Sequence, residues 1–294
     1  MKIEDVKVVA VLGAGTMGHG IAQILAGAGY SVVMRSRQQT TVESGLKRVK
    51  DSLQKLVERQ KMSQGDSEKL ISRISVTTDL ETALKNADMV IETIAEDMAL
   101  KKELFREITK LVKKEVILAT NTSTLSVTEI ASATDKPDKF VGMHFFNPVA
   151  LMPAVEIIRG ISTSDETVEL AKGLAAKLGK TPVVVRDSPG FASTRLGVSL
   201  FAEASKMFEE GVASVKDIDT GAKLFYGHRM GPFETCDIVG LDARLNNMKA
   251  LYQATGDPKW APPLLLKQLV AAGYLGKKPG SKGGYYAYFG LESQ

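Results

Sequence analysis

The chain has 294 residues, which corresponds to about two domains at roughly 150 residues each. Its composition, 44% hydrophobic and 24% charged, is that of a globular protein and excludes a chain that is disordered, collagen-like or coiled-coil throughout. The formal net charge of +4 is too small to predict nucleic-acid binding.

Three features predict a cytoplasmic protein. The N-terminal segment contains Glu4 and Asp5, which a secretory signal would not carry. No uninterrupted apolar run reaches the ~18 residues of a membrane span, so no membrane association is expected. The single cysteine, Cys236, fits a reducing compartment and permits neither an internal disulfide nor a thiolate metal cluster. We expect no metal site.

Predicted strands and helices alternate along the first part of the chain. Residues 6–12 predict a buried strand, 17–28 a helix that ends at Gly29, and 30–34 a second strand. A long amphipathic stretch follows at 41–62. Further strands are predicted at 74–76, 89–94, 116–120, 140–146, 154–158 and 181–186.

Capping boxes mark the start of three helices between these strands, each with a hydroxyl side chain at the cap and a carboxylate three residues later. The boxes are Thr78 with Glu81, Ser126 with Glu129 and Thr163 with Glu166, and Gly179 is expected to end the last of these helices.

The character of the sequence changes at Asp187–Gly190, because β-branched runs almost vanish there and helical periodicity takes over. We therefore expect two domains, residues 1–186 and 187–294. The first is predicted to have an α/β fold of the Rossmann type, a doubly wound parallel sheet. The second is expected to be an all-helical C-terminal domain, whose apolar helices suggest a contact between subunits.

A glycine-rich loop joins the first predicted strand to the first predicted helix. Its sequence, Gly13-Ala14-Gly15-Thr16-Met17-Gly18, matches the dinucleotide-binding fingerprint in the strand–loop–helix context that supports such a match. The glycines permit a tight turn, close approach of a pyrophosphate and close helix packing, and the helix N-terminus offers amides to the phosphates. The loop therefore predicts a dinucleotide cofactor.

The residues after the second strand bear on the choice of cofactor. An acid that selects NAD would stand about 20 residues after the glycine loop, but residues 13–42 contain neither Asp nor Glu. Arg35 and Arg37 flank Ser36 there and could hold a 2′-phosphate through charge-assisted hydrogen bonds. We expect a preference for NADP(H), with NAD(H) also possible; alternatively, both arginines are solvated strand-end charges.

An imidazole and a carboxylate stand in two successive apolar strands. His144 lies near the end of the predicted strand 140–146, and Glu156 follows twelve residues later inside 154–158. Burying either side chain without a partner is costly, so we expect the two to pair. Such a pair provides a general base for an alcohol that loses its proton during hydride transfer. The alternative is a structural hydrogen bond in the core.

The motifs GAGTMGHGIA, NTSTLS, HFFNPV with VEII, DSPGF and MGPFE occur in an order that resembles the 3-hydroxyacyl-CoA dehydrogenase family over essentially the whole chain. The resemblance implies that His144 is the acid/base and that Glu156 orients it. Ser123 matches a residue that contacts the substrate oxygen, and Asn121 matches one near the nicotinamide. Two further matches on the cofactor side are Glu96 and Lys101.

The chain departs from the family pattern at two positions. Thr194 stands where much of the family has an asparagine that helps to polarise the substrate carbonyl, and a threonine can donate one hydrogen bond over a shorter reach. Ser36 stands where the family usually has an aspartate, so the NAD implied by the resemblance conflicts with the local residues.

The resemblance also gives a meaning to the basic stretch at residues 47–61. The family binds the coenzyme A nucleotide along a helix at this place, and Ser52 and Arg59 best match its contacts, with Lys55 on the same face as Arg59. Alternatively this stretch is a solvated charged face, because Asp51 and Glu58 are interspersed.

The resemblance implies hydride transfer to and from a short-chain 3-hydroxyacyl-CoA/3-oxoacyl-CoA pair, by a homodimer whose helical domain serves substrate binding and dimerisation. The residues around Ser36 favour NADP(H) as the cofactor. A second interpretation keeps the fold and the cofactor but takes a free hydroxy acid of the gulonate or carnitine type as substrate. A third is a non-catalytic NADP-binding protein, which would not require His144 together with Glu156.

Overall fold

The structure, a computed structural model, describes residues 2–291 and divides between Ser188 and Pro189 into two compact units. Asp187 belongs to the first unit, because its carboxylate accepts hydrogen bonds from the Ser126 hydroxyl and the Thr128 amide. The first unit therefore extends two residues beyond the strand at 181–186.

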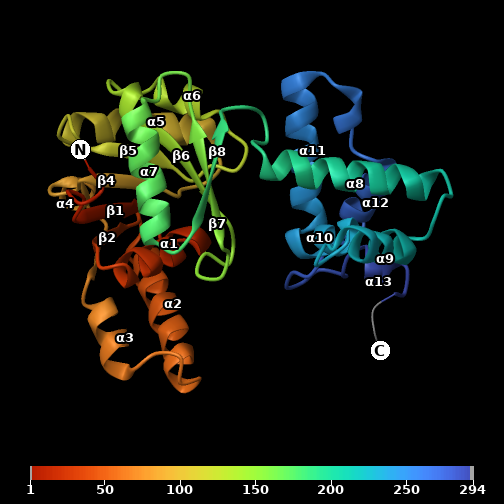
Figure 1. The fold of residues 1–294 in the computed structure, drawn as a ribbon, viewed down its shortest axis with the longest axis horizontal. Helices are drawn as coiled ribbons and strands as arrows, with labels where there is room; N and C mark the ends of the chain where they lie inside the picture. The colour runs from red at the N-terminus through yellow and green to blue at the C-terminus, as the bar shows by residue number, and fades with distance from the viewer. Residues whose placement is uncertain (1, 292–294) are drawn as a thin grey trace. The chain divides into compact units, whose positions relative to one another are not determined.

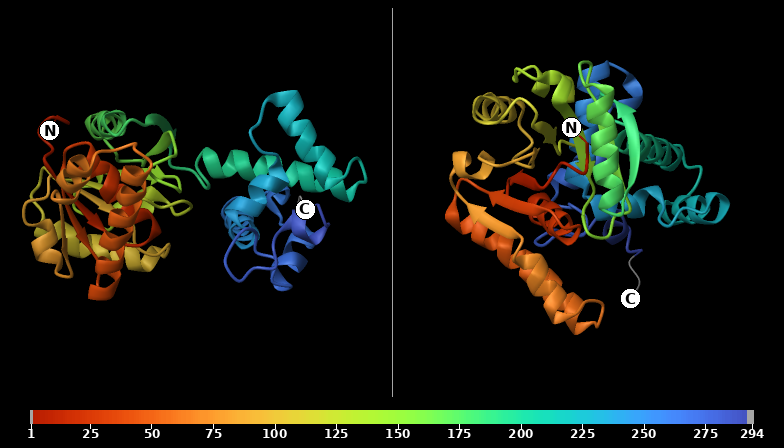
Figure 2. Two further views of the ribbon diagram at one scale, coloured as in Figure 1. Left: turned by 90° about the horizontal axis from the view of Figure 1, so that it is seen from below. Right: turned by 60° about the vertical axis from the view of Figure 1, so that its left-hand side comes forward.

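The first unit is built on one eight-stranded sheet with the strand order β3-β2-β1-β4-β5-β6-β7-β8 (Figure 1). Helices flank the sheet on both faces, which confirms the predicted α/β fold of the Rossmann type (Figure 2). The strands are β1 (Val8–Leu12), β2 (Ser31–Arg35), β3 (Ile74–Thr77), β4 (Met89–Glu92), β5 (Ile117–Thr120), β6 (Phe140–Phe145), β7 (Ala154–Arg159) and β8 (Thr181–Arg186).

One strand pair departs from the parallel arrangement that the sequence predicts. β6 and β7 pair antiparallel, whereas the other neighbours in the sheet are parallel. Only residues 146–153 join β6 to β7, and a parallel crossover needs a dozen or more residues. The short connection therefore forces the chain to return beside its own strand.

The helices of the first unit are amphipathic, and their apolar faces cover the sheet. Two valines and one leucine of the longest of these helices, Val42, Val49 and Leu53, are fully buried. That helix ends at Glu58 rather than at residue 62, and a second helix follows it. The helices are α1 (Thr16–Gly27), α2 (Gln39–Glu58), α3 (Gln64–Ile71), α4 (Leu80–Leu84), α5 (Met98–Leu111), α6 (Val127–Ala131) and α7 (Asp165–Lys177), with a 3₁₀ turn at Pro137–Lys139.

The caps of three helices test the predicted capping boxes. Ser126 caps α6 as expected, since its hydroxyl accepts the Glu129 amide. The predicted caps of the other two helices are wrong by one residue, because Asp79 caps α4 and Ser164 caps α7. Thr163 instead uses its hydroxyl to bond the carbonyl of Phe140 in the sheet.

The second unit is helical, as predicted, and has its own core. The rings of Phe201, Phe233 and Tyr285 pack together with centroids 4.9 to 5.8 Å apart, and Trp260 is buried in the same cluster. Its helices are α8 (Ser193–Glu209), α9 (Val215–Tyr226), α10 (Pro232–Val239), α11 (Leu241–Thr255), α12 (Leu264–Ala271) and α13 (Tyr285–Tyr288), with a 3₁₀ turn at Pro258–Trp260.

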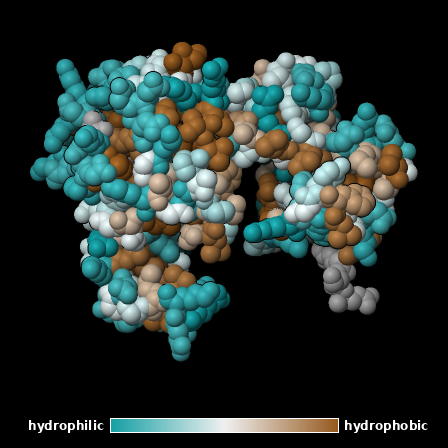
Figure 3. Space-filling model, in the orientation of Figure 1, coloured by the Kyte–Doolittle hydropathy of each residue, from teal (hydrophilic) through white to brown (hydrophobic). Residues whose placement is uncertain are grey.

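Several large apolar side chains of the second unit are exposed, and brown patches mark such residues on the face drawn in Figure 3. The most exposed lie at the end of α9, where Leu224, Phe225 and Tyr226 keep 76 to 81% of their surface accessible. Within residues 2–291, no helix combines the length and the apolar character that crossing a bilayer requires.

Candidate active site

The glycine loop closes tightly between β1 and α1. Gly13 has φ +118°, and a Cβ there would overlap Thr93 of the neighbouring chain segment. A Cβ on Gly18 would overlap the carbonyl oxygen of Gly13, so the helix can approach the loop only without a side chain. A Cβ on Gly15 would instead project into open space.

Open space in front of Gly15 is what a bound diphosphate needs. Gly15 is the N-cap of α1, whose first turn, with Thr16 and Met17, contains no acidic residue. The amide groups and the partial positive charge of this helix end would therefore attract an anion without competition from a carboxylate of the same turn. The loop residues fit a dinucleotide.

A pocket of about 370 Å³ lies beside the glycine loop at the carboxyl ends of β1, β2 and β4. Arg35, Ser36 and Arg37 line it, as do Gly13 and Gly15. Its other lining residues are Ala14, Gln38, Thr41, Thr93, Ile94, Ala95, Leu100 and Leu104.

Two guanidinium groups stand close together in this pocket. Burial and the neighbouring charge of Arg37 lower the pKa of Arg35 from its usual value. The Arg35 Nε donates to the carbonyl oxygen of Thr78 at 3.1 Å, which holds this side chain at the end of β2. A phosphate between the two guanidiniums would relieve their mutual repulsion.

The predicted imidazole–carboxylate pair lies in the antiparallel part of the sheet. His144 on β6 stands directly opposite Glu156 on β7, and Nδ1 of the imidazole is 2.8 Å from Oε2 of the carboxylate. Both side chains are buried, with relative exposures of 6% and 2%. The ring of Phe146 packs against the imidazole at a centroid distance of 4.6 Å. The register and the packing together fix the orientation of the imidazole.

The segment after β5 reaches the same edge of the sheet. Asn121 is buried, and its side-chain oxygen accepts the amide of Phe145, the residue after His144. The Ser123 amide donates to Oε1 of Glu96 at 2.8 Å. The structure therefore places Asn121 beside the end of β6 and ties Ser123 to the loop between β4 and α5.

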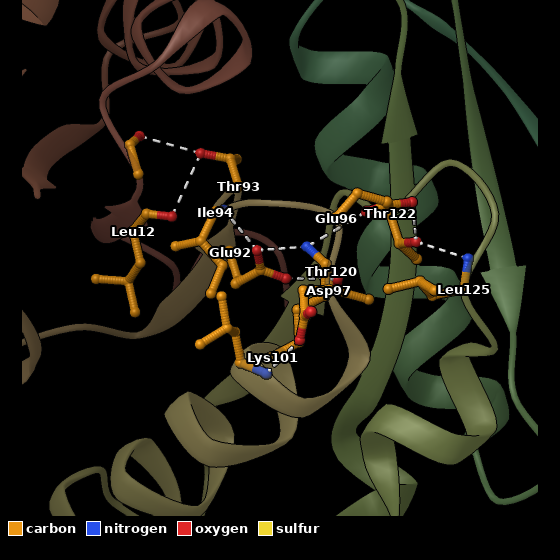
Figure 4. A network of polar contacts seen from close by, with 12 residues as sticks. Leu12, Glu92, Thr93, Ile94, Glu96, Asp97, Lys101, Thr120, Thr122 and Leu125 are labelled. Carbon is orange, nitrogen blue, oxygen red and sulfur yellow. Dashed lines mark hydrogen bonds and ion pairs between the residues drawn. The ribbon is translucent and has the colours of Figure 1, made fainter. Parts of the chain in front are cut away.

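Glu96 and Lys101 form part of a larger polar network that also contains Glu92 (Figure 4). The Lys101 Nζ lies 2.6 Å from Oε1 of Glu92 and 3.6 Å from Oε2 of Glu96. Glu92 is not among the site residues expected from the sequence, although an acidic side chain at the end of an apolar strand signals the need for a buried partner.

The remaining expected site residues lie elsewhere. Ser52 is half-buried on α2, while Lys55 and Arg59 are exposed at the end of this helix. Thr194 is half-buried in the first turn of α8 and belongs to the second unit. Among residues 2–291, no group of three or more His, Cys, Asp or Glu side chains is arranged to hold a metal ion.

Comparisons with known proteins agree with this architecture in both units. A family described as "3-hydroxyacyl-CoA dehydrogenase, NAD binding domain" matches residues 8–188, and one described as "3-hydroxyacyl-CoA dehydrogenase, C-terminal domain" matches residues 190–288. The first match indicates a nicotinamide cofactor.

Individual relatives match over nearly the whole length. The chain is 45% identical over 284 residues to a probable 3-hydroxybutyryl-CoA dehydrogenase of Bacillus subtilis, covering 97% of this chain and 98% of the relative. It is 43% identical over 279 residues to a 3-hydroxybutyryl-CoA dehydrogenase of Clostridioides difficile, covering 95% and 98%.

Among solved structures, the (S)-3-hydroxybutyryl-CoA dehydrogenase of Ralstonia eutropha superposes with a TM-score of 0.90 at 42% identity, covering 94% of this chain and 98% of that one. The two family matches together cover residues 8–288 except residue 189. The chain therefore belongs to the 3-hydroxyacyl-CoA dehydrogenase family.

Proposed function

We propose that this protein transfers a hydride reversibly between NADP(H), used in preference to NAD(H), and a short-chain (S)-3-hydroxyacyl-CoA/3-oxoacyl-CoA pair such as 3-hydroxybutyryl-CoA and acetoacetyl-CoA. The observation that carries the proposal is the buried 2.8 Å hydrogen bond between His144 and Glu156. The names of the relatives in Bacillus subtilis and Clostridioides difficile support the substrate class.

His144 acts as acid and base in this proposal. Because Glu156 holds Nδ1, proton exchange with the substrate oxygen falls to Nε2. During reduction His144 donates this proton to the oxygen on carbon 3, and during oxidation it takes the proton from the hydroxyl group. Glu156 fixes the tautomer and stabilises the imidazolium form. The bound nicotinamide supplies or receives the hydride at carbon 3.

Three further side chains assist in orienting the reactants. In this proposal the Ser123 hydroxyl donates to the substrate oxygen and the Asn121 amide lies near the nicotinamide. The hydrogen bond from the Phe145 amide to the Asn121 side chain, next to His144, supports the role of Asn121. Thr194 takes the place of the family's asparagine and gives the substrate carbonyl one hydrogen bond.

The cofactor preference rests on the pocket beside the glycine loop. Its lining brings Arg35, Ser36 and Arg37 together, and two guanidiniums with a hydroxyl suit a 2′-phosphate. No carboxylate lines this pocket among the described residues, so nothing there favours the 2′-hydroxyl of NAD over the phosphate of NADP.

A steady-state assay of acetoacetyl-CoA reduction, run side by side with NADPH and NADH, tests the proposal. We expect a higher kcat/KM with NADPH, and Arg37→Gln should lower that value while leaving the value with NADH nearly unchanged. Arg106→Gln, an exposed arginine on α5, is the matched control. A clear advantage for NADH would refute the cofactor preference, and absence of turnover with both cofactors would refute the reaction.

The basic end of α2 is proposed to bind the coenzyme A nucleotide through Ser52, Lys55 and Arg59. Neutralising Lys55 and Arg59 together should raise KM for acetoacetyl-CoA, because exposed cations at this helix attract the nucleotide phosphates. If the substrate were a free hydroxy acid of the gulonate or carnitine type, the same double variant would leave KM for that acid unchanged.

The protein is further proposed to act as a homodimer that is joined through its helical unit. The exposed apolar residues at the end of α9 support this, since monomers rarely leave such side chains clustered in water.

A further inference from the structure

The carboxyl end of β4 lies between the two loops that the proposed reaction uses. β4 pairs with β1 on one side and with β5 on the other, and its last residue, Glu92, is in register with Leu12 and Thr120. Leu12 immediately precedes the glycine loop, and Thr120 immediately precedes the segment 121–124. Any side chain at this strand end can influence both loops.

Glu92 is completely buried and accepts three hydrogen bonds. Its Oε1 accepts from the Lys101 ammonium and from the Ile94 amide, both at 2.6 Å, and its Oε2 accepts from the Thr120 hydroxyl at 2.6 Å. Burial raises the pKa of Glu92, whereas Lys101, Thr120 and Ile94 act in the opposite direction. This arrangement of donors suits a carboxylate that carries its charge.

Lys101 has two carboxylates within reach but lies closer to one of them. It is 1% exposed, and its Nζ contacts Glu92 at 2.6 Å while Glu96 stands 3.6 Å away. A buried ammonium needs a counter-charge, and attraction rises steeply at short distance in a poorly solvated site. As long as Glu92 satisfies this need, Lys101 does not draw Glu96 away from its other partners.

Those other partners of Glu96 form the segment that carries Ser123. Oε1 of Glu96 accepts the Thr122 hydroxyl at 2.6 Å (Figure 4). The same oxygen accepts the Ser123 amide at 2.8 Å and the Thr124 amide at 3.0 Å. A single carboxylate oxygen therefore holds three successive residues of this segment. The position of this oxygen depends on whether the Lys101 ammonium lies closer to Glu92 or to Glu96.

We propose that Glu92 is a positioning residue, which acts through Lys101 and Glu96 to hold residues 121–124 in the conformation that the reaction requires. The inference rests on the proposed function in that it assigns Asn121 and Ser123 to the reacting groups. Loss of the Glu92 charge would let the ammonium move toward Glu96, and the hydrogen bonds from Thr122, Ser123 and Thr124 would then weaken.

Glu92→Gln tests this, because glutamine keeps the shape of the side chain and removes its charge. We expect kcat for acetoacetyl-CoA reduction to fall about 10- to 100-fold, the range in which small misplacements of reacting groups act. KM for acetoacetyl-CoA should stay within about twofold, because α2 is the proposed site of the nucleotide and Glu92 does not touch it.

Hydrogen exchange gives a readout that needs no activity. The amides of Ser123 and Thr124 should exchange faster in Glu92→Gln than in the wild-type protein, because both donate to Glu96. Thr163→Val is the matched control, since it removes a buried hydroxyl that bonds Phe140 in the same sheet and contacts none of the network. It should leave both kcat and the exchange of these two amides unchanged.

Each outcome then separates the two ideas. Unchanged exchange at Ser123 and Thr124, or equal losses of kcat in Glu92→Gln and Thr163→Val, would overturn the positioning role. A wild-type protein without turnover would overturn the proposed function, while the exchange measurement would still decide the role of Glu92. If Glu92→Gln does not fold, Thr120→Val removes one hydrogen bond to Glu92 and should accelerate the same two amides to a smaller extent.

Discussion

At the residue scale, the imidazole–carboxylate pair is held by more than its own hydrogen bond. His144 and Glu156 occupy directly opposed positions of β6 and β7, so the backbone register sets their separation before either side chain chooses a rotamer. Phe146 then restricts the imidazole ring from one side. Such constraint suits a group that has to transfer a proton in a defined direction.

His144→Gln should lower kcat for acetoacetyl-CoA reduction by a factor of about 10² to 10⁴, the usual contribution of general acid–base catalysis. The affinity for NADPH, measured by titration of the protein without substrate, should remain nearly unchanged, because the glycine loop and the arginine pocket do not involve this residue.

His228→Gln provides the matched histidine control for this experiment. His228 is half-buried in the turn between α9 and α10 and has no proposed role in the reaction, so the variant should keep the wild-type kcat. If His144→Gln also kept it, the assignment of the acid/base would be wrong.

The sequence alone predicts one of the buried polar pairs of the candidate site but not the other. A histidine and a glutamate in successive apolar strands predict a contact, and the structure places the two within hydrogen-bond distance. Glu92 escapes the same reasoning because its partner Lys101 lies on a helix, and sequence spacing does not show which helical side chain turns toward the sheet. A short connection between two strands shows in the sequence that the strands are neighbours. Which helical side chain packs against the sheet cannot be read from the sequence in this way.

At the element scale, the sequence predicts the positions of the strands but not the direction of every strand. Short apolar runs predict the described strands to within a few residues. Buried parallel strands such as β4 and β5 are nearly continuous in hydrophobicity, whereas β8 is predicted by its valines although its side chains are half-buried or exposed. The direction of β7 depends instead on the length of the segment before it, which hydrophobicity does not report. Two of the three predicted caps are wrong by one position. At α4, Thr78 and Asp79 both have cap-forming side chains, and only geometry selects between them.

Asp79 offers a pH-dependent test of this selection. The hydrogen bonds from Thr82 lower the pKa of the Asp79 carboxyl in the folded protein. Its contribution to stability is therefore present above the ordinary carboxyl pKa of about 4 and is lost as the pH falls through the lower value of the folded state. Asp79→Ala should reduce the urea midpoint at neutral pH, and the difference from wild type should shrink under acid conditions.

Thr78→Ala is the matched variant for this measurement. The contact of Thr78 with Arg35 is made by its backbone carbonyl, which the substitution preserves, and its hydroxyl does not cap α4. The urea midpoint should stay close to that of the wild type at both pH values. An equal loss in both variants would contradict the assignment of Asp79 as the cap.

At the scale of the whole molecule, each unit has its own core and the sequence changes character where the units divide. The helical unit exposes more large apolar side chains than the sheet unit does. Three of them, Leu224, Phe225 and Tyr226, are consecutive in the sequence. A surface of this kind is expected to be covered by a second copy of the chain.

Phe225→Glu should therefore convert the protein from a dimer to a monomer, because a charge placed in an apolar contact is costly to desolvate. Sedimentation velocity would then report the mass of one chain instead of two. Ile161→Glu, which alters a similarly exposed apolar residue of the first unit, should leave the dimer intact. A monomeric wild-type protein, or a dimeric Phe225→Glu variant, would exclude this interface.

The contacts of the proposed site differ widely in the length of chain that they enclose. Glu92 meets Lys101 nine residues away and His144 meets Glu156 twelve residues away, whereas Thr93 meets the glycine loop across eighty residues. The entropic free-energy cost of closing the chain is about 1.7 kcal/mol larger for the contact of Thr93 with the glycine loop than for the His144–Glu156 contact. We therefore expect the acid–base pair to form early in folding and the cofactor cradle to be completed late, so that added dinucleotide acts mainly by slowing unfolding.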